Sequence, residues 1–179
     1  SGSGKTTAIK ALEDIGFYCV DNLPILLVPK FIELCGQSGG KISKVAVVED
    51  VRGEASYPGT EQALNRADTI SAGGAEGEKD FLVDSIRIIQ NLKREGYPIE
   101  ILFLESSNSI LMRRFSETRR QHPLAVGGSI REGLRLERER LQAIRDMAHQ
   151  VIDTSHLNVH QLKEKIQQYA EEGNPLGQM

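Results

Sequence analysis

SGSGKTT, residues 1–7, is the stretch that decides the fold class of this 179-residue chain. It matches all but the opening of the pattern G-x-x-x-x-G-K-[ST], the Walker A motif or P-loop, which binds nucleotide phosphates. Glycines allow several backbone N–H groups to turn towards closely spaced phosphate oxygens without obstruction by side chains. The stretch from Ser1 to Thr7 therefore predicts a phosphate-binding loop, followed at once by the N-terminus of a helix.

Each polar residue of the loop has an expected role. Lys5 supplies a mobile cation for the β- and γ-phosphates, and the N-terminus of the following helix adds a positive dipole end. The Thr6 hydroxyl is an oxygen ligand of the kind that Mg2+ prefers. The predicted nucleotide-binding residues in this stretch are Ser1, Gly2, Ser3, Gly4, Lys5 and Thr6, of which Lys5 and Thr6 are also candidate catalytic residues.

The first glycine of the pattern, and the strand that should lead into the loop, would both lie before Ser1. We therefore expect the natural chain to begin about ten residues upstream, with its first strand at the centre of the sheet. The alternative is that SGSGKT is a flexible Gly/Ser terminus. A helix pattern that begins in register at Lys5, and strands that follow in the expected order, argue against that alternative.

Apolar strands alternate with amphipathic helices along the rest of the chain. Each strand is apolar at consecutive positions, as in a sheet covered on both faces. The fold class predicted is α/β, a three-layer α/β/α P-loop NTPase fold with a mostly parallel sheet whose first strand is missing from the chain. Strands are expected at residues 17–20, 45–48, 99–104 and 151–153, and helices at residues 5–15, 24–35, 81–96, 109–120, 129–148 and 159–169.

The length and composition predict one soluble domain. Hydrophobic residues make up 39% and charged residues 26% of the chain, which suits a globular protein. We expect a P-loop domain over residues 1–172, interrupted by a long exposed loop at 53–79 that is rich in Gly, Ser, Ala and Glu, and a frayed tail at 173–179. Cys19 and Cys35 lie in apolar stretches without metal-ligand spacing, which favours buried structural thiols.

The location and the partners are predicted from charge and hydropathy. No apolar run approaches the roughly 20 residues that cross a bilayer, and no signal peptide pattern opens the chain, so a cytoplasmic protein with no membrane partner is expected. The formal net charge of −3 gives no overall attraction to nucleic acid or to anionic lipid. Whether the chain forms a homo-oligomer is left open.

A carboxylate at the end of a strand beside the loop is the usual second metal ligand of a P-loop protein. Asp50, which follows the apolar run from Val45 to Val48, is the first choice. Thr6 and Asp50 are thus the predicted Mg2+ ligands, and Asp50 joins Lys5 as a candidate catalytic residue.

Three other carboxylates also lie at strand ends. Asp21 and Glu105 are either further candidates or polar residues that mark where a buried strand reaches the surface. Asp153 has the same position on the last strand. Thr154 and Ser155 beside it are interpreted equally well as caps for the following helix.

Arginines concentrate on two predicted helices. The first group forms either a phosphate clamp or a solvated helix face, and the two interpretations carry equal weight; it comprises Arg113, Arg114, Arg119 and Arg120. The second group alternates with glutamates and favours an ion-paired surface; it comprises Arg131, Arg135, Arg138, Arg140 and Arg145, with Glu132, Glu137 and Glu139. His122 is interpreted as an ordinary surface residue.

Two stretches are not general features of P-loop proteins. They are ALEDIGFYCVDNLP at residues 11–24 and RRFSETRRQHPL at residues 113–124. Together with VEDVR at 48–52 and VIDTS at 151–155, they make the chain resemble the RapZ/YvcJ family of bacterial P-loop nucleotide-binding proteins. The resemblance spans nearly the whole chain apart from residues 53–79.

The resemblance implies specific ligands. ATP is expected at residues 2–6, and GTP at a site that matches Asp50, Val51, Arg52 and Gly53, with weak ATPase and GTPase activity; the family usually has asparagine at the position of Gly53. The implied cofactors are ATP, GTP and Mg2+. Family members carry a further C-terminal domain that contributes to RNA binding, and because the chain ends at Met179 without it, RNA binding is not expected.

Three classes of function follow from these residues. The first is a slow nucleoside triphosphatase, in which Lys5, Thr6-bound Mg2+ and Asp50 stabilise charge on the transferred phosphoryl group. The second is a regulatory adaptor whose conformation depends on nucleotide occupancy without hydrolysis. The third is a small-molecule or nucleotide kinase, with the arginines near Arg119 closing over the donor. The sequence favours nucleotide binding with weak hydrolysis in a regulatory role.

Overall fold

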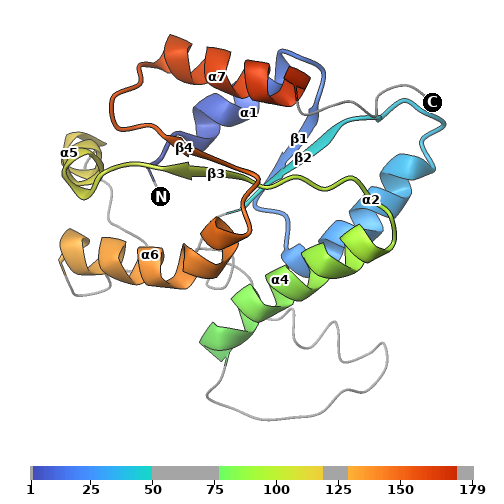
Figure 1. The fold of residues 1–179 in the computed structure, drawn as a ribbon, viewed down its shortest axis with the longest axis horizontal. Coiled ribbons are helices and arrows are strands. Elements are labelled where there is room, and N and C mark those ends of the chain that lie inside the picture. Colours follow the sequence, from blue (N-terminus) through green and yellow to red (C-terminus); the bar gives the residue numbers. More distant parts are fainter. Residues whose placement is uncertain (1, 50–76, 119–128, 173–179) are drawn as a thin grey trace.

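The computed structural model describes residues 2–49, 77–118 and 129–172 of the chain (Figure 1). In the first of these ranges, helix α1 (Lys5–Glu13) begins directly after the glycine-rich loop, at the residue that the sequence predicts. The elements that follow α1 are strand β1 (Tyr18–Asp21), the short 3-10 helix η1 (Ile25–Leu27), helix α2 (Val28–Gly36) and strand β2 (Val45–Val48).

The second half of the chain repeats the alternation of helices and strands. Helix α4 (Gly77–Arg94) leads to strand β3 (Leu102–Glu105) and helix α5 (Asn108–Thr118). Helix α6 (Ile130–Asp146) is followed by strand β4 (Gln150–Asp153) and helix α7 (Val159–Glu172).

Several predicted boundaries are corrected by the structure. The helix expected at 5–15 ends at Glu13, because Gly16 at φ +87° turns the chain into β1. The strand expected at 99–104 begins only at Leu102. Helix α4 begins at Gly77, so the last three residues of the loop expected at 53–79 are helical. The rest of that loop and the tail expected at 173–179 lie outside the described residues.

The strands pair in parallel, as predicted, but not in one sheet. β1 pairs with β2 in the register that sets Tyr18 opposite Val45, and β3 pairs with β4 in the register that sets Leu102 opposite Gln150. Within the described part of the chain these are two separate two-stranded sheets. Each strand has one partner, and no described strand lies between β2 and β3 to join the two pairs. The single sheet of the sequence prediction is therefore not observed in the described residues.

Helices cover both sides of the strands, with α1 and α7 on one side and α4 and α6 on the other (Figure 1). The best-buried cluster joins α1, β4 and α7, and in it Ala11 and Ile166 are 0% exposed. A second cluster joins η1 and α2 to α4 through Ile25, Val28 and Leu92. A third links α5 to α6 through Leu111, Phe115 and Leu134.

The two cysteines and the helices bear on two further predictions. Cys35 is buried, as expected, whereas Cys19 is half-buried; both are free thiols. Burial, with a smaller contribution from the charge of Glu13, raises the pKa of the Cys19 thiol.

None of the described helices is long and apolar enough to span a membrane.

Candidate functional site

The glycine-rich loop has a backbone that only glycine adopts easily. Gly2 has φ +76° and Gly4 has φ +102°, both in the left-handed region. The Gly4 carbonyl accepts hydrogen bonds of 3.0 Å from the N–H groups of Thr7 and Ala8, which begins helix α1. A Cβ at Gly4 would lie 2.7 Å from Cδ2 of Leu162 on α7. Both the conformation and the space therefore require glycine at position 4.

Two side chains from distant parts of the chain bind the carbonyl groups of this loop. Arg114 on α5 donates from Nη1 to the Gly2 carbonyl over 2.8 Å. Thr154, which follows β4, donates from Oγ1 to the Ser3 carbonyl over 3.0 Å. Thr154 is 1% exposed and Ser3 is 7% exposed. The loop is thus attached to α5 and to the carboxyl end of β4.

These contacts set the direction of the amide groups in the loop. In a trans peptide the N–H points away from the C=O of the same unit. With the carbonyls of Gly2 and Ser3 bound to Arg114 and Thr154, the next two N–H groups point away from those side chains. The Lys5 N–H likewise points away from the body of α1, because the Gly4 carbonyl is bound within it. Successive N–H groups at a helix N-terminus are an anion-binding arrangement.

The predicted site residues are described only in part. Gly2, Ser3, Gly4, Lys5 and Thr6 form the loop and the first turn of α1, where the Thr6 side chain is exposed. Ser1 lies outside the described residues, as do Asp50, Val51, Arg52 and Gly53. The Mg2+ site of Thr6 and Asp50 and the second nucleotide site therefore stay predictions. In the described ranges no group of three or more His, Cys, Asp or Glu residues is placed to hold a metal ion.

Glu105, one of the candidate carboxylates, is held in an ion pair. Arg145 on α6 donates to it from Nε and Nη2, over 2.8 and 3.0 Å. The hydrogen bond from Arg145 lowers the pKa of the Glu105 carboxyl, and the charge of Arg138 adds to the effect. Asp21, in contrast, is exposed at the end of β1.

Asp153 is bound by its own neighbour. Ser155 donates to Oδ1 of Asp153 from its hydroxyl over 2.5 Å and from its N–H over 2.8 Å, and these bonds lower the pKa of Asp153. The interpretation of Thr154 and Ser155 as helix caps is wrong, because their hydroxyls bind Ser3 and Asp153 instead. Asn158 and Gln161 cap α7, each side chain accepting from the backbone N–H of the other.

The two described arginines of α5 have different partners, and the solvated helix face fits only Arg113; a phosphate clamp on this helix stays a prediction. Arg114 points to the loop, whereas the Arg113 side chain is 67% exposed and lies 3.6 Å from Glu117. Successive residues on a helix face directions about 100° apart, so neighbours seldom share a partner. Arg119, Arg120 and His122 lie outside the described residues.

The ion-paired surface predicted for α6 is present around Arg135. Its guanidinium lies 2.6 Å from Glu132 and also contacts Glu139. The exposure of all three side chains exceeds half. This part of the prediction is confirmed.

Arg138 and Arg145 of the same helix do not belong to that surface. Arg138 donates to the Ser106 carbonyl over 2.5 Å and to Asn108 over 2.9 Å, and Arg145 binds the end of β3. The sequence contains the signal for this, since residues four and seven positions apart share a helix face. Leu134, which is 1% exposed, starts the series with Arg138, Leu141 and Arg145, so both arginines follow the helix face that begins at Leu134, although Arg138 itself is exposed.

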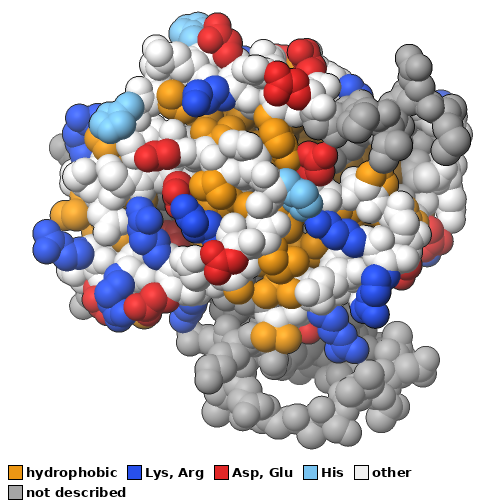
Figure 2. Space-filling model, in the orientation of Figure 1, with side chains coloured by type: hydrophobic (Ala, Val, Ile, Leu, Met, Phe, Trp, Pro, Cys, Tyr) orange, Lys and Arg blue, Asp and Glu red, His pale blue; other side chains and the backbone are white. Residues whose placement is uncertain are grey.

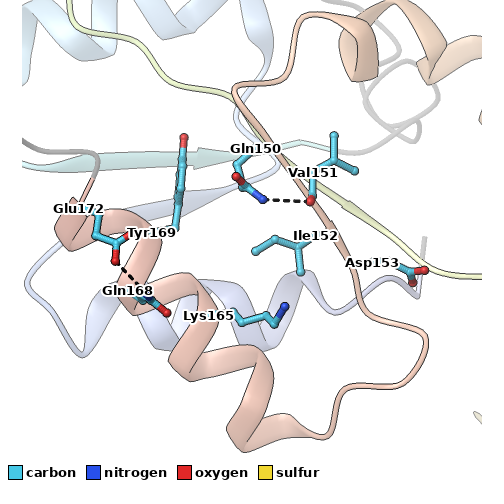
Figure 3. A pocket seen from close by; sticks show the side chains of 8 residues that line it. All are labelled: Gln150, Val151, Ile152, Asp153, Lys165, Gln168, Tyr169 and Glu172. Atoms are coloured by element: carbon cyan, nitrogen blue, oxygen red, sulfur yellow. Dashed lines mark hydrogen bonds between the residues drawn. The ribbon is translucent and has the colours of Figure 1, made fainter.

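A groove of about 340 Å³ lies beside β4 and α7, apart from the phosphate loop (Figure 3). Tyr169 in this groove donates from its hydroxyl to Glu100 over 2.5 Å. Burial, together with that bond, raises the pKa of Tyr169. The lining is mostly polar and includes Gln150, Asp153, Lys165, Gln168, Tyr169 and Glu172. No residue of the loop lines it.

Charges on the visible face of the molecule are mixed. Figure 2 shows Lys and Arg side chains interspersed with Asp and Glu across that face, without a continuous basic stripe. This agrees with the net charge of −3. The face shown therefore lacks the single-sign field that attracts polyanions at long range.

The chain is similar to known proteins over most of its length. The chain matches the model of the RapZ-like N-terminal domain over residues 1–72 and 77–174. A protein of Myxococcus xanthus is 47% identical over 93% of this chain and 49% of its own length. Proteins of Desulforudis audaxviator and Geobacter sulfurreducens are 45% and 43% identical, each over 93% of this chain and over 48% and 50% of their own lengths. All three are named nucleotide-binding proteins, and the chain spans about half the length of these curated relatives.

Proposed function

The chain belongs to the RapZ-like N-terminal domain family, and from this premise we propose that it binds a nucleoside triphosphate through the loop from Gly2 to Thr6. The observation that carries the proposal is the attachment of the Gly2 and Ser3 carbonyls to Arg114 and Thr154. It turns the following N–H groups away from the protein side chains and leaves them to face an anion. The names of the relatives add independent support.

The finer assignment follows the pattern of the loop. ATP binds at residues 2–6, with the Lys5 ammonium against the β- and γ-phosphates. The exposed Thr6 hydroxyl on the first turn of α1 fits one ligand position of Mg2+. Asp50 supplies the carboxylate ligand, and residues 50–53 bind GTP. Bound Mg2+ would neutralise phosphate charge, while Lys5 stabilises the charge that develops during slow hydrolysis.

We propose, as the wider architecture, a three-layer P-loop fold in which a strand before Ser1 joins the two strand pairs. Both pairs are parallel, and neither β2 nor β3 has a second partner among the described strands. A chain extended upstream by about ten residues should therefore melt at a higher temperature than the chain from Ser1. Equal melting temperatures would count against the joining strand.

The binding proposal is tested by calorimetric titration with Mg-ATP and Mg-GTP on the chain extended upstream by about ten residues. We expect Lys5→Ala to abolish ATP binding, because the loop loses its only side-chain ammonium within the motif. Lys10→Ala is the matched control, since Lys10 is an exposed lysine on the same helix and should bind as the wild type does. Retained affinity in Lys5→Ala, or no binding by the wild type, would contradict the proposal.

Hydrolysis is tested separately from binding. Release of phosphate from ATP in the absence of any acceptor supports a slow triphosphatase. Tight binding without turnover supports a regulatory adaptor, and ADP formation that depends on an added acceptor supports a kinase. We expect slow release without an acceptor, because Lys5 and Thr6 are of the residue types that stabilise phosphoryl transfer.

A further inference from the structure

We propose that Arg114 and Thr154 are positioning residues of the phosphate loop, which raise its affinity for triphosphate by holding the Gly2 and Ser3 carbonyls towards the protein and away from the ligand. The inference rests on the proposed function, because it assigns a role within that same site. Both residues lie far from the motif in sequence, 112 and 151 residues from their partners in the loop. Neither is part of the phosphate-loop pattern.

Thr154 is itself fixed before it reaches the loop. Its backbone N–H donates to the Glu105 carbonyl of β3 over 2.8 Å, which continues the pairing of β3 with β4. The side chain is 1% exposed, so its hydroxyl has no competing water. Its Cγ2 lies 4.0 Å from the position that a Cβ would take at Gly4. The hydroxyl is therefore placed by the sheet, and the Ser3 carbonyl is placed by the hydroxyl.

Arg114 connects the loop to the same point. Its Nη1 donates to the Gly2 carbonyl over 2.8 Å, and its Nη2 donates to the Thr154 carbonyl over 3.1 Å. Nη1 also lies 3.4 Å from the Thr154 hydroxyl. Because a guanidinium is planar, two such bonds fix its orientation. Lysine carries a single ammonium and cannot bridge the loop and the strand end in this way.

The consequence for binding is preorganisation. Glycine-rich loops sample many conformations, and a ligand that must order such a loop binds less tightly. Arg114 and Thr154 bind the Gly2 and Ser3 carbonyls through contacts within the protein itself, so the amide groups that follow are held facing one way. Removing either anchor should weaken triphosphate binding while the fold remains.

The test measures the dissociation constant of Mg-ATP for the upstream-extended chain and its variants, at a temperature where circular dichroism shows each variant to be folded. Thr154→Val keeps the shape and removes the hydroxyl, and we expect about tenfold weaker binding. Thr154→Ser restores the hydroxyl and should bind within about twofold of the wild type. Arg114→Met should weaken binding about 30-fold, and Arg114→Lys should recover only part of the loss.

Arg113→Met is the matched control, since this exposed arginine on the same helix pairs with Glu117 and should leave the dissociation constant unchanged. A purely structural role would lower melting temperatures without changing affinity in folded protein. If the wild type binds ATP, Lys5→Ala does not, and Thr154→Val binds as the wild type does, the inference is overturned while the proposed function stands. If Arg114→Met does not fold, the Thr154 pair decides alone. Failure of the wild type to bind removes the proposed function itself.

Discussion

The two strand pairs end differently, although both are parallel and of equal length. At the carboxyl end of β3 and β4, side chains from α5 and α6 bind the backbone, and Thr154 reaches into the phosphate loop. At the carboxyl end of β1 and β2, Asn22 turns the chain at φ +55° and its N–H donates to the Val48 carbonyl over 2.9 Å. The glycine-rich motif thus identifies the residues that would contact the ligand. The strand pair β3–β4, which lies far from the motif in sequence, provides the residue that holds the loop in place, Thr154.

The two larger core clusters also differ, in their burial and in their distance from the loop. The cluster of α1, β4 and α7 contains residues at 0% exposure and lies directly beneath the loop, with Leu162 against Gly4. The cluster around Ile25, Val28 and Leu92 packs α4 against η1 and α2, and its residues are 3–8% exposed. Substitutions in these two clusters should therefore have similar effects on folding and different effects on ligand binding.

The largest effect on stability is expected when a core leucine is removed from either of these two clusters. Leu92→Ala and Leu162→Ala remove the same group from positions that are 3% and 5% exposed, so each should cost about 2–5 kcal/mol of unfolding free energy. Only Leu162→Ala should also weaken ATP binding, because Leu162 supports Gly4. Urea unfolding and calorimetric titration of both variants measure the two effects. Equal weakening of ATP binding in both variants would show that the cluster beneath the loop supports the ligand site no more than the other cluster does.

A somewhat smaller effect is expected from Gly4→Ala. The new Cβ would combine an unfavourable φ of +102° with an approach of 2.7 Å to Leu162, and together these should cost about 2 kcal/mol or more. Gly16→Ala is the control, because Gly16 has φ +87° and no atom within 4 Å of the added group; it should cost about 1 kcal/mol. Thermal melts give both values, and equal costs would show that the contact with Leu162 yields freely.

How much the sequence predicts depends on whether the relevant contacts are local. Val45–Val48 is predicted to the residue, because a β-branched apolar run between polar segments has no competing local interpretation. The start of α1 at Lys5 follows from the motif itself. The arrangement of strands in a sheet is harder to predict, because pairing joins strands that lie far apart in the chain. The sequence predicts one sheet, and the described strands form two separate pairs.

The site shows the same limit. The neighbours of Thr154 in the sequence suggest a helix cap, whereas its partner in the structure, Ser3, lies 151 residues away. The sequence leaves two equal interpretations for Arg114, which is one of four arginines in its stretch. Only the direction in which its side chain leaves α5 distinguishes it from Arg113. The direction of Arg138 and Arg145 is recoverable from sequence, because they lie four and eleven residues after Leu134, on the helix face that begins at that buried leucine.

A smaller effect, dependent on pH, is expected at Glu105. Because its carboxylate is paired with Arg145, the pKa of Glu105 is lowered from its ordinary value of 4.5. The pair therefore stabilises the fold above that pH, and its contribution is lost as the pH falls through the lowered value. Glu105→Gln should cost about 1 kcal/mol near pH 7, and the difference from the wild type should shrink below pH 4.5. Urea unfolding at pH 7, 5 and 3.5 measures this; a difference that grows on acidification would contradict the assignment.

The smallest effect is expected from Arg135→Gln, which provides the contrast within α6. Arg135 binds Glu132 and Glu139 in side chains more than half exposed, where water and salt screen the charges and the side chains lose entropy on pairing. Removing it should leave the unfolding midpoint unchanged within error at 0.15 M salt. Arg138→Gln should lower the midpoint measurably, because Arg138 binds the Ser106 carbonyl at the end of β3. Equal shifts would mean that an arginine bound to the backbone at the end of β3 contributes no more than one paired only with carboxylates on its own helix, and the contrast between Arg138 and Arg135 would lose its energetic basis.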